Sequence, residues 1–115
     1  MTSPEPTLIA VNDVRADRAD DFENWLRAVV APAMAEHQPH LEGRWRVLRG
    51  TEVEDGVVVF AFVCTGGTDE DWELQPLLEK SLGAQGAERA LADMRGMLTE
   101  DQQGWWFSDV RLDGG

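Results

Sequence analysis

Four polar or amphipathic side chains have the types and positions that small-molecule chemistry requires. Asn12 is a short amide in an otherwise apolar segment, and an amide can donate a hydrogen bond to an oxygen that gains negative charge. Trp72 stands near the start of a predicted helix and could form a rigid wall against a flat aromatic ligand. Histidine in general titrates near neutral pH and is a common general base, so either His37 or His40 could take that role. We expect His37, Asn12 and Trp72 to be the catalytic residues of a small-molecule site.

Each of these residues also has a purely structural interpretation. Asn12 could cap the turn after the first strand, as asparagine often does. Trp72 could pack in the core. The two histidines could be solvated at a helix end, where the helix dipole favours positive charge. Two histidines without a third ligand at a suitable spacing predict no metal site, and we expect no cofactor.

Other side chains near these positions are the predicted ligand contacts. Arg44 and Arg46 share one face of a strand and could clamp a carboxylate or a phenolate, or could be solvated or paired with the chain's many acids. Cys64 lies in an apolar segment without neighbouring positive charge, which predicts a buried core thiol. The remaining predicted contacts are mostly apolar or aromatic: Phe22, Trp25, Leu26, His40, Leu77 and Trp105.

Composition narrows the class of protein. The chain has 115 residues, 43% of them hydrophobic, which suits one folded domain. Its net charge of −12 disfavours binding to nucleic acid or to an anionic membrane surface. No apolar segment approaches the roughly 20 residues that span a bilayer, and the N-terminus does not resemble a signal peptide. We therefore expect a cytoplasmic protein with neither nucleic acid nor membrane as a partner.

The hydrophobic periodicity predicts an α+β domain of the ferredoxin-like kind. Two helical regions alternate with four strands in the order β-α-β-β-α-β, which gives a four-stranded antiparallel sheet with both helices on one face. Pro32 should kink or interrupt the first helix, and Gly83 and Gly86 should break the second. The strands are expected over 7–11, 43–50, 57–64 and 105–111. The domain is expected over 7–111, with flexible ends at 1–6 and 112–115.

The strands carry more apolar surface than two helices can cover. The segment Val57–Cys64 is apolar at both parities, and Trp105, Trp106 and Phe107 are aromatic on both faces. Large exposed apolar patches usually mark an interface, and a second copy of the chain is the simplest cover. We therefore expect a homodimer that forms through the open face of the sheet.

Three short motifs and the element order together resemble a known superfamily. The motifs are Ala10-Val11-Asn12, His40-Leu41-Glu42-Gly43 and Asp71-Trp72. With the length of the chain, they resemble the dimeric α+β barrel superfamily, and within it the antibiotic-biosynthesis monooxygenases and the related heme-degrading monooxygenases. The heme-degrading branch has a pocket asparagine and a pocket tryptophan at the first and third motifs. Its axial histidine is replaced here by Leu82, which argues against heme binding.

The resemblance implies an enzyme of secondary metabolism, an oxidoreductase that needs no cofactor. Its substrate would be a flat aromatic or polyketide-like molecule that is deprotonated and then reacts with oxygen, or that undergoes a related non-oxidative cyclisation. His37 would be the base, Asn12 the contact to an oxyanion or peroxide, and Trp72 the wall. The alternatives are a non-catalytic dimeric protein that binds a small hydrophobic ligand, or a structural protein with a filled core. The sequence leaves open whether the chain is an enzyme.

Overall fold

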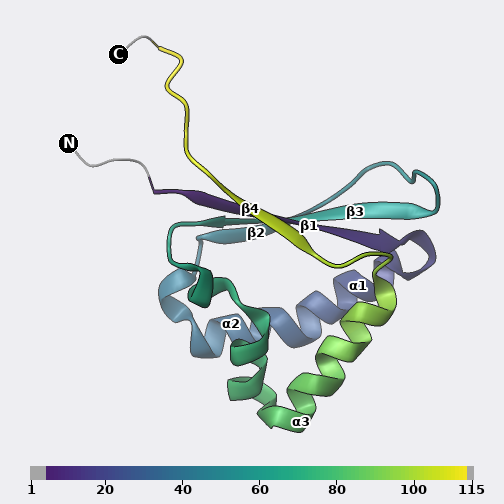
Figure 1. Ribbon diagram of the computed structural model, residues 1–115. Coiled ribbons are helices and arrows are strands. Elements are labelled where there is room, and N and C mark those ends of the chain that lie inside the picture. The colour runs from purple at the N-terminus through teal and green to yellow at the C-terminus, as the bar shows by residue number, and fades with distance from the viewer. Residues whose placement is uncertain (1–4, 114–115) are drawn as a thin grey trace.

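The computed structural model describes residues 5–113, which form one antiparallel sheet with helices against one of its faces (Figure 1). The strands are β1 (Thr7–Arg15), β2 (Trp45–Arg49), β3 (Val57–Thr65) and β4 (Gln103–Phe107), in the spatial order β2-β3-β1-β4. The main helices are α1 (Ala19–Trp25), α2 (Ala31–His37) and α3 (Leu74–Met97). The predicted ferredoxin-like order of elements is confirmed.

The first and last strands differ most from those that the sequence predicts. Strand β1 continues to Arg15 and pairs with β3 over its whole length, from Thr7 opposite Thr65 to Arg15 opposite Val57. The predicted last strand, 105–111, was placed too late, because β4 ends at Phe107. Beyond it the chain leaves the sheet (Figure 1), and Val110 is 77% exposed. The polar pair after Phe107 offers no apolar alternation that would extend the strand.

Proline and glycine shape both helical regions. A π-helical turn, Leu26–Val30, joins α1 to α2 just ahead of Pro32. Proline has no N–H and crowds the carbonyl four residues earlier, so a widened turn there confirms the predicted disturbance. Helix α3 breaks at Gly83, whose φ of 77° and ψ of 170° are non-helical. The predicted second break at Gly86 was wrong, since the helix has already resumed there.

An aromatic cluster fixes the helices to the middle of the sheet. Phe22 of α1 packs edge-on against Phe60 of β3, with ring centroids 4.9 Å apart, and stacks with Phe62 at 6.4 Å. Trp25 stacks on Phe22 from the next helical turn at 5.9 Å. Phe22 and Phe60 are fully buried, and burying a side chain of this size contributes about 1.5–3 kcal/mol. Helix α1 therefore covers the centre of the sheet.

None of the described helices covers the opposite face of the sheet (Figure 1). Strand register places four large apolar side chains on it that are 42–50% exposed: Leu48, Val59, Trp105 and Phe107. Half-buried Ile9, Val11, Ala61 and Val63 lie among them. We call these eight residues the open face. No described helix is long and apolar enough to cross a membrane.

The break in α3 generates a prediction about stability. A Cβ at Gly83 would meet no neighbouring atom, but its φ and ψ suit only glycine. We therefore expect Gly83→Ala to lower the free energy of unfolding by about 1–3 kcal/mol, measured by urea denaturation at fixed protein concentration. Gly96→Ala is the matched control, because its Cβ is also unobstructed and its backbone is helical. It should be neutral or stabilising by up to about 1 kcal/mol. Equal effects of the two changes would refute the argument.

Candidate functional site

Asn12 lies in the middle of β1 and faces the helices. Its side chain is 0% exposed, and among the described residues it is the only buried side chain classed as polar or charged. It stands opposite Phe60, whose other neighbour across the sheet is Arg49. The interpretation of Asn12 as a cap at the strand end was wrong, because the strand continues for three more residues. An amide in this position needs another explanation, since burial of a polar group is costly.

Only half of the Asn12 amide is hydrogen-bonded. Its Oδ1 accepts a hydrogen bond from Nε2 of Gln102 at 3.0 Å, whereas its Nδ2 has no partner. Register explains the pairing: Val11 opposes Gln103, so Gln102 lies beside Asn12 just before β4 begins. A buried donor without a partner costs about 1–3 kcal/mol. The Asn12 amide thus holds a donor that no side chain in the described structure satisfies.

Trp72 is fixed by its surroundings. It ends a short 3-10 helix, Asp69–Trp72, which begins with a capping box between Thr68 and Asp71. The Thr68 backbone N–H donates to Asp71 at 2.9 Å, and this hydrogen bond is the main cause that lowers the pKa of Asp71. The indole Nε1 of Trp72 donates to the carbonyl of Gly66 at 2.8 Å. With its N–H engaged, the half-buried ring offers an apolar face in a defined orientation.

A groove connects Trp72 with the residue that bonds Asn12. It has a volume of ≈ 670 Å³ and runs between the start of α3, β1 and the segment before β4. We call it the α3 groove. Its apolar walls are Leu8, Trp72, Leu74 and Pro76, and its polar lining is Gln75, Gln102, Asp69, Glu73 and Glu79. This volume lies within the range of about 300–1,000 Å³ that is common for small-molecule sites.

Neither histidine lines this groove. His37 ends α2 with its Nε2 3.8 Å from a carboxylate oxygen of Glu36. His40 is more exposed, and its Nε2 lies 3.7 Å from Oδ1 of Asp71, the residue before Trp72. Gln38 donates to the Asp71 carbonyl at 3.5 Å. The end of α2 is therefore packed against the segment that carries Trp72, which brings His40 closer to the groove lining than the sequence alone indicated.

The other predicted contact residues divide into three groups. Phe22, Trp25, Leu26 and Leu77 are buried in the core between the helices and the sheet. Arg44 pairs with Glu5 at 2.6 Å, and Arg46 is exposed and by register shares the side of the sheet on which the open face lies. Trp105 belongs to the open face, on the side of the sheet opposite Asn12. The structure brings Trp72 and Asn12 together through Gln102, and separates Trp105 from both.

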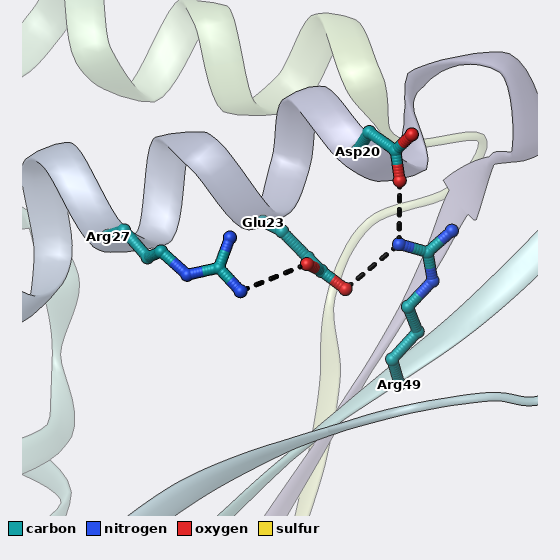
Figure 2. Close-up of polar contacts among 4 residues, drawn as sticks. All are labelled: Asp20, Glu23, Arg27 and Arg49. Carbon is teal, nitrogen blue, oxygen red and sulfur yellow. Dashed lines mark hydrogen bonds and ion pairs between the residues drawn. The ribbon is translucent and has the colours of Figure 1, made fainter.

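A second concavity, of ≈ 250 Å³, lies between β2 and the first helical region. We call it the β2 cavity. Figure 2 shows a series of ion pairs beside this cavity. Nη1 of Arg49 contacts a carboxylate oxygen of Asp20 and one of Glu23, each at 2.8 Å. Arg27 contacts Glu23 at 3.2 Å. The hydrogen bond from Arg49 is the main cause that lowers the pKa of Glu23. Because the charges balance and the volume is small, this cavity fits a ligand less well than the α3 groove.

Gln102 and Arg49 have no place among the predicted site residues. Gln102 meets Asn12 across 90 positions of sequence, and only the pairing of β1 with β4 reveals the contact. By register Arg49 lies on the face of β2 opposite to that of Arg46. Its partners Asp20 and Glu23 are supplied by a helix, which no local pattern indicates.

Solved structures share this fold. A protein named as a candidate antibiotic biosynthesis monooxygenase from Nitrosomonas europaea aligns over 99% of this chain and 98% of its own, with 14% identity and a TM-score of 0.54. Two others are named dimeric ferredoxin-like proteins. One, from Thermobifida fusca, covers 95% and 94% of the two chains with 17% identity and a TM-score of 0.54. The other, from an uncultured marine organism, covers 94% and 90% with 12% identity and a TM-score of 0.57.

These likenesses establish the fold that the sequence predicted. The first name is one of the two kinds of monooxygenase that the sequence resembles, and the other names agree with the predicted ferredoxin-like fold. No protein-family model matches the sequence, and no curated protein matches it. At identities of 12–17% the shared feature is the fold, so the chemistry must be argued from the residues of this chain.

The buried thiol yields a prediction about reactivity. Cys64 is 6% exposed, and burial raises the pKa of its thiol to about 11. Because the thiolate is the reactive form, we expect Ellman's reagent to modify the native protein slowly near neutral pH. The rate should rise as the pH approaches that pKa, and denaturant should remove the protection. Rapid stoichiometric modification of the native protein near neutral pH would contradict this assignment.

Proposed function

We propose that this protein is a small enzyme that binds a flat, largely apolar aromatic substrate in the α3 groove and promotes its oxygenation without a cofactor. The observation that carries the proposal is the buried amide of Asn12, whose Oδ1 is hydrogen-bonded and whose Nδ2 is not. Its partner Gln102 lines a groove that Trp72 also lines. A buried donor without a partner is costly, and it is useful where an oxygen gains charge during a reaction. The name of the Nitrosomonas europaea neighbour supports the same class of chemistry.

The reaction that suits this arrangement begins with removal of a proton from a ring carbon that is conjugated with a ring carbonyl, such as the methylene opposite the carbonyl of an anthrone. The resulting enolate gives electrons to dioxygen, so that one oxygen atom becomes a new ring carbonyl and the other leaves as water. For an anthrone the product is an anthraquinone, and atoms and electrons balance without a further reductant. Asn12 would donate to the enolate oxygen, and Trp72 would hold the rings flat.

The base in this proposal is His37, with His40 as the histidine nearer to the groove lining. The titratable groups that line the α3 groove are the carboxylates of Asp69, Glu73 and Glu79. Asp69 also accepts a hydrogen bond from Nε1 of Trp106 at 2.6 Å. A histidine base would have to act from the end of α2, across the segment that carries Trp72. His37→Ala and His40→Ala separate these two candidates through their pH–rate profiles.

The second candidate function is binding without turnover. It is favoured by the groove lining of the described structure, which includes a donor and an aromatic wall but no histidine. The same groove would then sequester a small hydrophobic ligand. Quenching of tryptophan fluorescence by a ligand that is never converted would support this function.

We also propose that the protein is a homodimer that buries the open face against a second copy. Four large apolar side chains on that face are 42–50% exposed, and patches of this kind usually mark an interface. Two structural neighbours are named as dimeric ferredoxin-like proteins. A twofold axis would place the same surface of each copy in contact.

Replacement of Asn12 tests the function. We expect Asn12→Val to lower oxygen uptake with dithranol, a dihydroxyanthrone, by about 100-fold or more, as loss of an oxyanion donor does. Its free energy of unfolding should stay level or rise, because the change removes an unpaired buried donor. Asn24→Ala, on the exposed side of α1, is the control. Parallel losses of stability and uptake would assign Asn12 a structural role, and absence of uptake by the wild type would exclude the oxygenation.

A charge on the open face tests the dimer. Val59→Lys keeps the new ammonium in water in a monomer but buries it in the proposed interface, where an unpaired charge is very costly. We expect sedimentation equilibrium to give a dimeric mass for the wild type and a shift towards the 12.8 kDa monomer for the variant. Val53→Lys, at a 65% exposed position outside the open face, should remain dimeric. A monomeric mass for the wild type would contradict the proposed homodimer.

A further inference from the structure

Gln102 both lines the α3 groove and bonds the buried amide of Asn12. It lines the groove, it is exposed to solvent, and its Nε2 donates to Oδ1 of Asn12. It belongs to the segment between α3 and β4 and not to a strand, so its side chain can move without breaking the sheet. Asn12 itself is 0% exposed. Gln102 therefore joins the lining of the groove to a buried amide that is not itself part of that lining.

The hydrogen bonding between the two amides is incomplete. A primary amide has an acceptor oxygen and a donor nitrogen side by side, and two amides can satisfy each other at both positions. Here Nε2 of Gln102 donates a hydrogen bond to Oδ1 of Asn12, and Nδ2 of Asn12 has no partner. A group that carried one donor and one acceptor on the same edge could bond both atoms of Asn12. It would replace one hydrogen bond with two and remove the cost of the unpaired donor.

We propose that Gln102 is a displaceable cover over Asn12, and that the substrate takes its place with a hydroxy-carbonyl edge. The substrate hydroxyl donates to Oδ1 of Asn12, and the neighbouring carbonyl accepts from Nδ2. This inference rests on the proposed function and narrows its substrate class from flat aromatics to those with a hydroxyl beside a ring carbonyl. Displaced Gln102 loses little, because its exposed amide can bond to water.

The groove lining fits such a ligand body. Leu8, Trp72, Leu74 and Pro76 offer apolar contact to the rings, while the acids Asp69, Glu73 and Glu79 disfavour a ligand that enters as an anion. A neutral hydroxy-carbonyl compound meets both conditions. It acquires charge only when it is deprotonated in the site, next to Nδ2 of Asn12.

Two substitutions at Gln102 should act in opposite directions. Gln102→Ala removes the cover, so dithranol should bind about 5–10-fold more tightly, by the gain of one uncompensated hydrogen bond. Gln102→Glu replaces the donor to Oδ1 with a carboxylate, which the Asn12 amide meets with Nδ2 by turning over. This charge-assisted hydrogen bond then occupies the donor, so binding should weaken by about 10-fold. A residue that merely supports the fold or orients Asn12 would weaken binding in both variants. Gln85→Ala and Gln85→Glu, at an exposed position on α3, are the controls and should bind as the wild type does.

The test that needs no ligand is solvent exchange of the Asn12 side-chain amide protons, followed by NMR. The Nδ2 protons should exchange slowly in the wild type and at least about tenfold faster in Gln102→Ala, because the cover is gone. Unchanged exchange would overturn the cover, whatever the ligand does. If exchange accelerates as expected while dithranol fails to bind both proteins, the cover stands and the proposed substrate class fails. Tryptophan fluorescence measures the binding, with anthrone as the weaker-binding comparison that lacks the hydroxyl groups.

Discussion

The packing of Phe22 onto Phe60 and Phe62 is the contact on which the rest of the structure depends. It holds α1 against the centre of the sheet, and both Phe22 and Phe60 are sealed from water. Asn12 lies opposite Phe60 in the sheet and is likewise fully buried on the side that faces the helices. A helix anchored at this central position also leaves room beside it, where the start of α3 and the segment before β4 form the groove.

The two faces of the sheet follow from one alternation along the strands. Side chains that point to the helices build the core, and among the described residues Asn12 is its one buried polar side chain. Those that point away include the eight apolar residues of the open face, over which none of the described helices lies (Figure 1). A strand such as β3, apolar at both parities, is expected when both faces are covered. The fold and the proposed dimer therefore have the same physical origin.

The sequence predicts the fold well because periodicity is a local property. Alternation in Val57–Cys64 and helical spacing after Trp72 gave the element order, and Pro32 and Gly83 marked the irregular turns where they occur. Asn12 stood out as a polar residue in an apolar strand, and its complete burial agrees with that signal. The extents of β1 and β4 were missed, because pairing with a neighbouring strand and not local propensity decides where a strand ends.

The site was harder to predict, because its contacts join distant segments. Gln102 reaches Asn12 through strand register, and Arg49 of β2 reaches Asp20 and Glu23 of α1 (Figure 2). Trp105 was expected near the ligand, yet strand parity puts it on the open face. When a strand is apolar at both parities, the spacing of its residues in the sequence does not show which of them face the helices.

The most direct measurement of the central claim is a crystal structure of the protein with dithranol or its quinone product. The account predicts ring contact with Trp72, a ligand oxygen within hydrogen-bond distance of Nδ2 of Asn12, and Gln102 turned away from that amide. A ligand in the β2 cavity beside Arg49 or on the open face, with Gln102 still bonded to Asn12, would contradict it.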